Sequence, residues 1–297
     1  MEWARFAEQL VGALAIGCIY SLIALGYSMI IRATEILHFA QGEIVMLGAM
    51  FGVTLFRFTP LPYVAVFIIA MALAGVAGFL LEVGVYRVLR GRKVTLLNIM
   101  IATVGVSIVL QNVARLTWGS EPIRYPTIYA KATYSLGPLQ VPTQMLWVVL
   151  AGLALMVALQ LFFEKTRQGL ALQAAAQDPQ TAQLMGINLD RTISLTFAIS
   201  GAVGGAAGVL LAPMFFATFD MGFITGIKGF VAATLGGLGS IPGAMLGGIL
   251  FGILETFGAI WISTSYKDAI GMILLIVILL VFPQGLMGLI GQGEGRR

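Results

Sequence analysis

The sequence has few charged residues, one histidine and one cysteine. Charged residues make up 10% of the chain, against about 25% in soluble domains, which excludes an ordinary soluble protein. The single His38 excludes sites built from several histidines, both metal centres and proton relays, so we expect no metal site. The single Cys18 excludes an intrachain disulfide, and within an apolar stretch it is a small apolar side chain.

The sequence also lacks the motifs of nucleotide hydrolysis. The glycine-rich run Gly236–Gly239 is not followed by the Lys-Ser/Thr pair of a phosphate-binding loop. No Ser/Lys or paired-Asp arrangement lies in a clear span, as an intramembrane protease would need. We therefore expect no enzyme activity and no cofactor in this chain. If the chain takes part in an energy-coupled process, the energy would come from a partner or from an ion gradient.

Apolar residues make up 59% of the chain, and the mean hydropathy is +0.97. Runs of about 20 apolar residues, the length that crosses a bilayer, occur at 9–31, 63–86, 94–117, 144–163, 192–213 and 268–290, with less regular ones at 36–57 and 228–262. This pattern predicts an all-α polytopic membrane protein with about eight spanning segments, one or two of them broken or re-entrant, in a single transmembrane domain over 1–297. The first run is too long for a cleavable signal peptide, and no cleavage site follows it.

Charge around the spans predicts which loops lie in the cytoplasm. Segment 87–93 holds four basic residues and no acid, which places it in the cytoplasm by the positive-inside rule. Segment 164–191 follows two spans later and lies on the same side, whereas 118–143 lies outside. The net charge of +4 is thus explained by topology, and we expect no nucleic-acid partner. Eight simple crossings would leave both termini outside, unless an irregular segment is broken or re-entrant.

The polar segment 164–191 carries local signals for two helices separated by a sharp break. Residues 168–177 are rich in Ala, Leu and Gln, a composition that favours helix. Asp178 and Pro179 end that helix and begin a second one, because Asp caps helices and proline suits the first helical position.

The second helix is expected over Pro179–Met185, and Gly186 provides the left-handed residue that ends it. Asp190 is the expected cap of the span that follows. A helix of two turns is unstable alone in water, so it needs apolar contacts from its own chain or from a partner, through Ala182, Leu184 and Met185. The residues leave two alternatives open, an ordinary cytoplasmic connection and a docking element for a partner outside the membrane.

Glycine is abundant, with 37 residues, and much of it lies at a spacing of four. This spacing lets membrane helices approach closely, and it predicts packing faces at Gly201, Gly204, Gly205 and Gly208, and at Gly243, Gly247, Gly248 and Gly252. Segment 228–262 is also interrupted by Gly236-Gly237, Gly239-Ser240 and Pro242-Gly243, which predict a break. The break is either a half-helix end inside the bundle or a loop at the membrane surface.

A few polar residues lie within or beside the apolar runs. The candidates for the translocation pathway are His38, Gln41, Glu43, Asn98 and Gln111. The first three begin segment 36–57; inside the membrane they would line the pathway or fasten helices, and at the surface they would only start a helix. The residues alone favour the surface alternative. Glu82 and Glu255 lie near enough to span ends for their carboxylates to reach water.

Three long stretches resemble one transporter family, in the order in which that family carries them. They are GCIYSLIALGYSMIIRATEILHFAQGEIVMLGA, TRQGLALQAAAQDPQTAQLMGINLDRTISLTFAISGAVGGAAGVLLAP and GIKGFVAATLGGLGSIPGAMLGGILFGILE. Over nearly its whole length, the chain resembles the branched-chain amino acid permeases of bacterial ABC importers, the LivH-type membrane subunit.

The resemblance implies that Ala174–Gly186 docks in a groove of the ATPase subunit. The coupling residues are then Ala174, Ala175, Asp178, Pro179, Ala182, Leu184, Met185 and Gly186. It also implies that the start of 36–57 is buried in the bundle, since Phe39–Glu43 matches the family motif Phe-Ala-x-Gly-Glu. Two positions depart from the family: Gln173 stands where relatives often carry Arg, and Gln41 where they usually carry His, so no titrating role is expected at Gln41.

The resemblance further implies a bacterial inner-membrane permease that passes branched-chain amino acids from a periplasmic binding protein to the cytoplasm by ATP-driven alternating access. Its partners would be a second, LivM-type permease, two ATPase subunits that bind ATP and magnesium, the binding protein and the lipid bilayer. The alternative substrates within the class are urea, short amides and other amino acids. The alternatives from other classes are an ion-coupled secondary transporter or channel, and a structural assembly subunit. Few intramembrane carboxylates and the expected absence of a buried mid-span Lys or Arg argue against ion coupling.

Overall fold

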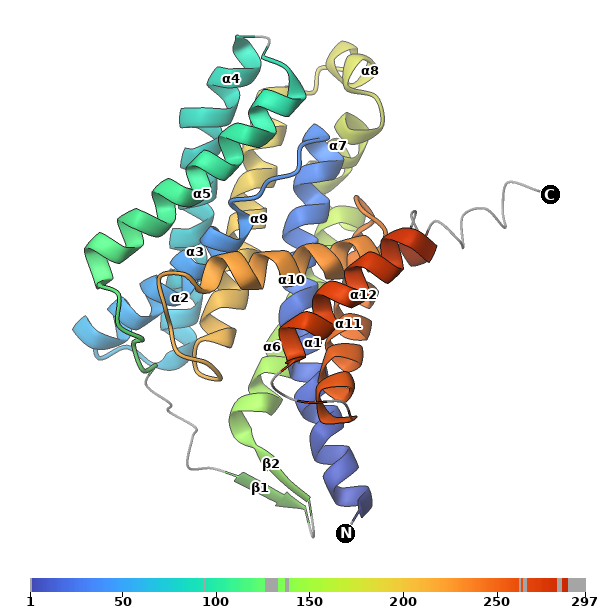
Figure 1. Ribbon diagram of the computed structural model, residues 1–297. Coiled ribbons are helices and arrows are strands. Elements are labelled where there is room, and N and C mark those ends of the chain that lie inside the picture. Colours follow the sequence, from blue (N-terminus) through green and yellow to red (C-terminus); the bar gives the residue numbers. More distant parts are fainter. Residues whose placement is uncertain are drawn as a thin grey trace, which may run out of the picture.

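The computed structural model describes residues 2–92, 94–125, 133–136, 139–261, 263, 266–281 and 285–287. The described chain is a helical bundle, which confirms the all-α prediction (Figure 1). Seven of its helical stretches are long and apolar enough to cross a membrane. They contain α1 (Glu2–Thr34), α3 (Tyr63–Leu81), α5 (Leu96–Trp118), α6 (Thr143–Lys165), α9 (Leu189–Leu211), α11 (Ile241–Trp261) and α12 (Lys267–Val281).

The two ends of the bundle carry different elements (Figure 1). One end has α4 (Arg87–Gly91), α7 (Arg167–Gln177) and α8 (Pro179–Leu184); because it includes the basic segment 87–93, it is the cytoplasmic end. The opposite end has an antiparallel hairpin of β1 (Thr133–Leu136) and β2 (Leu139–Pro142). The backbone N–H of Gln140 donates to Glu8 Oε1 over 2.7 Å, which ties the hairpin to the start of α1. Sequence reading did not predict this hairpin.

Two further helices, α2 (Gln41–Phe58) and α10 (Met221–Gly236), begin inside the bundle (Figure 1). Each follows a non-helical segment, 35–40 before α2 and 212–220 before α10. Their first turns meet at Gly42 and Gly222, where a Cβ on Gly222 would lie 2.8 Å from the carbonyl oxygen of Gly42. Irregular backbone at this depth is tolerated because it is surrounded by protein. The predicted interruption of segment 36–57 is therefore confirmed.

Segment 228–262 contains parts of two helices, with the break at the predicted position. Helix α10 ends at Gly236 and α11 begins at Ile241, with Gly237 and Gly239 at φ of 104° and 82° between them. The turn lies near Arg32 at the cytoplasmic end of α1, as the surface-loop alternative requires. Together with α2 and α10, the seven long stretches make nine membrane segments in the described chain. An odd number of crossings places the start of α1 and the end of α12 on opposite sides of the membrane, the first outside and the second towards the cytoplasm. Eight crossings would have left both outside, so this conflict no longer arises.

Eight of the nine segments form two sets of four helices with equivalent packing. The contact of α1 with α11 corresponds to that of α9 with α3. The contacts of α10 with α1 and α12 correspond to those of α2 with α9 and α5. Helices α1 and α9 run in opposite directions (Figure 1). The sets α1–α2–α3–α5 and α9–α10–α11–α12 are thus inverted repeats, an arrangement common in transporters, with the Gly42–Gly222 contact between them.

Small residues permit this close packing. A Cβ on Gly201 would lie 2.6 Å from the carbonyl oxygen of Ala74, so α3 and α9 meet with almost no side chain between their backbones. Six of the other predicted packing glycines also face helix backbones or small side chains at close range: Gly205 faces Ala74, Gly208 faces the Val45 backbone, Gly243 faces Gly236, Gly247 faces Ala232, Gly248 faces Ser21 and Gly252 faces Gly17. Gly204 instead faces the Gln41 side chain.

Candidate functional site

The polar segment at the cytoplasmic end folds as helix, break and short helix, as its local chemistry predicted. Thr166 caps α7 by accepting a hydrogen bond from the Gly169 N–H over 2.9 Å. The Asp178 carboxylate accepts bonds from the N–H groups of Gln180 and Thr181, each 3.0 Å long, and so begins α8. Hydrogen bonding to Thr181 is also the largest cause that lowers the pKa of Asp178 below its ordinary value.

The end of this segment agrees with the prediction at one residue and differs at another. Gly186 has φ of 86°, the left-handed conformation expected after α8. The predicted cap at Asp190 is wrong, because Asn188 Oδ1 accepts from the Arg191 N–H over 3.0 Å and caps α9 instead. Asp190 lies in the first turn of α9, where its carboxylate faces Arg90.

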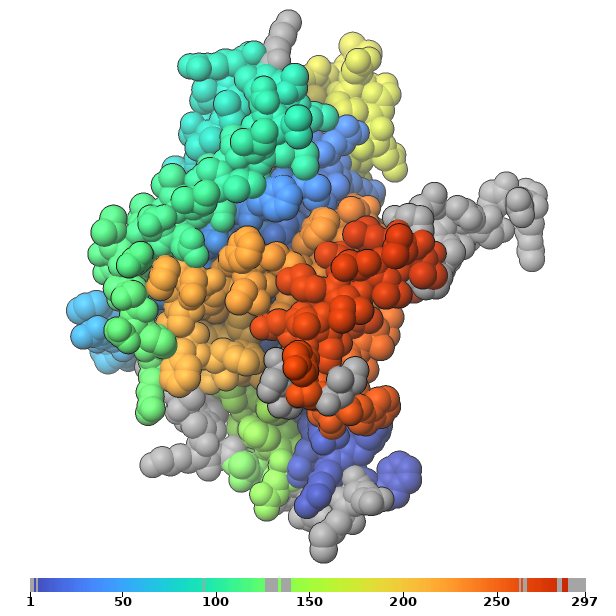
Figure 2. Space-filling view, viewed as in Figure 1, coloured from blue at the N-terminus to red at the C-terminus, as the bar shows by residue number. Residues whose placement is uncertain are grey.

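The α8 tip presents apolar side chains to the aqueous phase. Leu184 is 87% exposed and Met185 is 79% exposed, whereas Ala175 and Ala182 are buried against their own chain. Ala174, Asp178 and Pro179 are also exposed. Figure 2 shows α8, in yellow, protruding at the cytoplasmic end of the molecule. These neighbouring exposed apolar side chains make the α8 tip a candidate surface for binding another protein.

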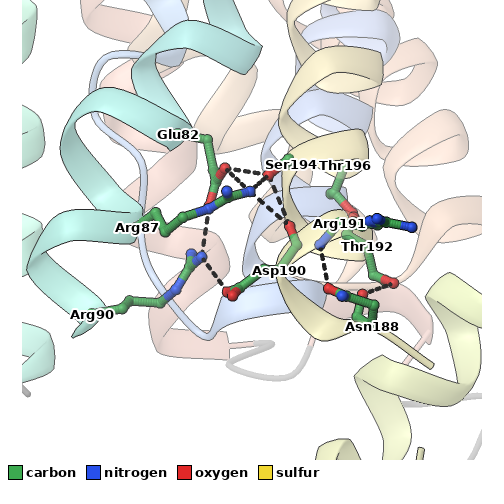
Figure 3. A network of polar contacts seen from close by, with 9 residues as sticks. All are labelled: Glu82, Arg87, Arg90, Asn188, Asp190, Arg191, Thr192, Ser194 and Thr196. Atoms are coloured by element: carbon green, nitrogen blue, oxygen red, sulfur yellow. Dashed lines mark hydrogen bonds and ion pairs between the residues drawn. The ribbon is translucent and has the colours of Figure 1, made fainter. Parts of the chain in front are cut away.

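An ionic cluster lies directly beside this segment, made of Glu82, Arg87, Arg90, Asp190 and Ser194 (Figure 3). The Glu82 carboxylate is fully buried, with Oε1 2.6 Å from Arg90 Nη2 and Oε2 3.3 Å from Arg87 Nη2. The Ser194 hydroxyl also donates to Oε2. We call this set the Glu82 cluster; it joins the end of α3 to the first turns of α9.

Local backbone geometry places Glu82 for this role. Residues Glu82–Tyr86 form a π-helical turn, η1, between α3 and α4; such turns are rare and often mark functional sites. The prediction that Glu82 reaches water near a span end is wrong, because neighbouring cations make burial of the carboxylate favourable. The basic residues five and eight positions later were the sequence signal for this pairing.

The predicted pathway residues at the start of α2 are buried. His38, Gln41 and Glu43 are each at most 1% exposed, so the surface alternative is wrong and the burial implied by the family motif is confirmed. The His38 ring packs edge-on against Tyr86 and Phe197, with centroids 5.1 and 5.3 Å away.

Gln41 and Glu43 fasten different helices. The Gln41 Oε1 lies 3.1 Å from Ser200 Oγ, which joins α2 to α9. Glu43 Oε1 accepts a bond from the Ser107 hydroxyl over 3.1 Å, while Oε2 lies beside Gly222 with no hydrogen-bond partner in the described chain. Glu43 therefore places a carboxylate where the α2 and α10 N-termini meet, and the positive ends of both helices favour it there.

The two remaining pathway candidates lie elsewhere. Asn98 is exposed at the start of α5, and Gln111 is partly exposed further along the same helix. Helix α5 packs only lightly on the bundle and, with α10 and α12, forms much of the face seen in Figure 2. The structure thus brings together the three candidates from 36–57 but not the two from α5.

A second ionic cluster was missed by sequence reading. Lys228 Nζ, on α10, lies 2.7 Å from both Glu255 Oε1 on α11 and Asp268 Oδ1 on α12. Tyr20 donates to Glu255 Oε2 over 2.8 Å, and Lys267 Nζ lies 3.8 Å from the same oxygen. We call these residues the Lys228 cluster. Two expectations are therefore wrong: Glu255 is buried rather than reaching water, and a buried lysine does lie within the bundle.

Comparison with known proteins identifies the family. The family model described as "Branched-chain amino acid transport system / permease component" matches residues 9–279. The chain belongs to this permease family. Its sequence is 36% identical to the high-affinity branched-chain amino acid transport system permease proteins LivH of Salmonella typhimurium, LivH of Escherichia coli and BraD of Pseudomonas aeruginosa, each covering 97% of both chains. No solved structure gave a significant match.

The match covers both structural halves of the permease and the connection that contains α7 and α8. The resemblance inferred from three stretches is thereby confirmed. With its seven long apolar stretches, the permease is a multi-pass inner-membrane protein. The Glu82 and Lys228 clusters are features of this chain's own geometry, and neither was identified from the resemblance.

Proposed function

We propose that this permease is the membrane subunit of an ABC importer that passes branched-chain amino acids into the cytoplasm. The observation that carries the proposal is the family match over residues 9–279, together with full-length relatives whose names give this transport system. The permease would move its substrate without converting it. Urea, short amides and other amino acids are the alternative substrates.

The proposed partners follow from this role. Two ATPase subunits would bind ATP and magnesium at the cytoplasmic end, and a periplasmic binding protein would deliver substrate at the hairpin end. A second, LivM-type permease would cover part of the apolar face that α5, α10 and α12 leave exposed (Figure 2). The lipid bilayer would cover the rest of that face.

The geometry supports a direct route from the ATPase to the bundle. Leu184 and Met185 would insert into the ATPase groove, and Ala182 anchors α8 on its own chain. The segment then enters α9 at Asn188, within the same turns that the Glu82 cluster ties to α3. A displacement of α8 would therefore move α3 and α9 together and change which end of the bundle is open.

The docking part of the proposal is tested by Leu184→Asp combined with Met185→Asp. Both side chains are exposed, so the double variant should insert and fold normally, yet it should lose the co-purifying ATPase and ATP-dependent leucine uptake. Thr133→Asp, in the hairpin at the opposite end, is the matched control and should keep the ATPase bound. ATPase retention and normal uptake by the double variant would disprove the docking role of α8.

The ion-coupled alternative deserves a direct test, because the buried Lys228 cluster is a feature that ion-coupled transporters also use. The permease reconstituted with its companions should take up leucine only when ATP and the ATPase subunits are present. Uptake driven by an ion gradient without ATPase subunits would establish the alternative and overturn the proposal.

A further inference from the structure

A pocket of about 420 Å³ opens beside the Lys228 cluster. Its volume lies within the range of roughly 300–1,000 Å³ typical of small-molecule sites. The 212–220 segment and the beginning of α12 lie on the hairpin side of α10 (Figure 1), and they form its walls with α10 and α1. Its lining includes Leu211, Phe215, Phe216, Asp220, Ile224, Lys228, Lys267 and Asp268.

The pocket lining combines apolar and charged side chains. Leu211, Phe215, Phe216 and Ile224 are the apolar residues, and two lysines and two aspartates are the charged ones. Lys267 Nζ lies 5.8 Å from the centre of the Phe215 ring. Cation and carboxylate are thus held a few ångströms apart beside aromatic and aliphatic surface. This is the complement of an α-amino acid zwitterion with a branched aliphatic side chain, which needs a cation, an anion and an apolar wall.

The two acids that bind Lys228 are held differently. Glu255 is fully buried and is also bound by Tyr20. The Asp268 side chain is 66% exposed and shares Lys228 from the pocket side. Lys228 therefore keeps one permanent counter-ion and one that a ligand carboxylate can replace without leaving the buried lysine unpaired. Asp220 makes no capping bond to α10, so its carboxylate is available to the pocket.

We propose that this pocket binds the amino acid zwitterion in transit through the permease. The substrate carboxylate pairs with Lys228 and Lys267, its ammonium group pairs with Asp268 and Asp220, and its side chain packs against Phe215 and Phe216. The proposal rests on the proposed function, since it names the substrate site of the same transport route. It assigns a role in passage to residues that otherwise would only link α10, α11 and α12.

The test uses the complete purified transporter without its binding protein, and measures the shift in apparent Tm on addition of L-leucine. Isoamylamine, which lacks the carboxylate, and 4-methylpentanoate, which lacks the ammonium group, are the comparison ligands. Leucine should give a saturable upward shift and the two analogues none. Equal shifts with leucine and either analogue would contradict recognition of the zwitterion.

Two variants separate binding from structure. Asp268→Asn keeps the Lys228–Glu255 pair and should raise the leucine concentration needed for the shift about tenfold or more, as expected when a charge-assisted hydrogen bond is lost. Glu121→Gln is the control, because it removes an exposed carboxylate that is not among the pocket-lining residues; it should leave leucine binding unchanged. Ile224→Trp reduces the pocket volume without removing any charged group and should abolish the shift.

The outcomes distinguish this site from the proposed function. If the reconstituted wild-type transporter takes up leucine, and the Asp268→Asn and Ile224→Trp variants bind and transport it as the wild type does, the pocket is not the site and the cluster is structural only. If the wild-type transporter takes up no branched-chain amino acid at all, the proposed function fails first.

Discussion

The Arg90 guanidinium lies 2.6 Å from the buried Glu82 carboxylate and 3.8 Å from Asp190. Arg90 therefore binds an acid at the end of α3 and another at the start of α9 (Figure 3). The two helices that it joins are also packed closely through glycine along their length. On the proposed docking role, a displacement of α8 would therefore move α3 and α9 as a pair.

Glu82→Gln should destabilise the permease and weaken coupling. The change removes the charge that balances Arg87 and Arg90, and because both arginines are partly exposed we expect a loss of roughly 1–3 kcal/mol, less than for a fully buried pair. Thermal inactivation in detergent measures the stability, and the ratio of ATP hydrolysed to leucine imported measures coupling. Glu164→Gln, an exposed acid at the same end, is the control; equal values for both variants would refute a role for the cluster.

Gly186→Val should disturb the exit from α8. A β-branched residue at φ of 86° costs roughly 1–3 kcal/mol, so α8 should shift or unwind and the ATPase should bind less tightly. Gly186→Asn is the matched control, because asparagine tolerates the left-handed conformation. ATPase co-purification from the two variants checks this prediction. Similar losses in both variants would mean that glycine is needed because any side chain at position 186 is harmful, and not because of its left-handed backbone conformation.

Asp178→Ala should loosen α8, whereas Asp178→Asn should keep it, because asparagine also caps helices. Hydrogen exchange of the Gln180 and Thr181 amides at pH 7 measures the cap. Since hydrogen bonding lowers the pKa of Asp178, the carboxylate cap is complete above the ordinary aspartate pKa and is lost only as the pH falls through the lowered value. ATPase binding through α8 should therefore not vary with this group between pH 6 and 8. A titration of binding in that window would contradict the assignment.

Gly42→Ala should be much more harmful than Gly105→Ala. A Cβ at Gly42 would overlap the backbone of Gly222 and Gly226, and overpacking of this kind costs roughly 1–3 kcal/mol. A Cβ added at Gly105 on α5 would meet no other element of the described chain within 4 Å, so that variant should be neutral or slightly more stable. The apparent Tm of each purified variant provides the comparison. A Gly42→Ala permease as stable as Gly105→Ala would show that the α2–α10 contact is looser than described.

The features that sequence predicted best depend on neighbouring residues. Asp178, Pro179 and Gly186 act on backbone groups within a few positions, so their local chemistry determines where α8 begins and ends. Six of the seven long spans likewise coincide with the six regular apolar runs, because length in a bilayer is a local property.

The features that sequence missed depend on residues far apart in the chain. Glu255 accepts a hydrogen bond from Tyr20, which is 235 positions away in the sequence, and Glu82 accepts one from Ser194, 112 positions away. An acid near a span end gives no sign of partners so far away, so access to water was the natural expectation, although Arg87 and Arg90 stand close to Glu82 in the sequence. The start of α2 was ambiguous for the same reason, since an acid in a first turn is equally common at a surface helix. The inverted repeat escaped notice because equivalent packing does not require similar sequence.

The meeting of Gly42 and Gly222 has a mechanical consequence. A rotation about a central point displaces opposite ends in opposite directions, and this backbone contact lies between the two inverted halves. It can therefore serve as the pivot of the proposed transport cycle. Closing the cytoplasmic end would then open the hairpin end in the same movement, so a single displacement by the proposed ATPase would act on both ends.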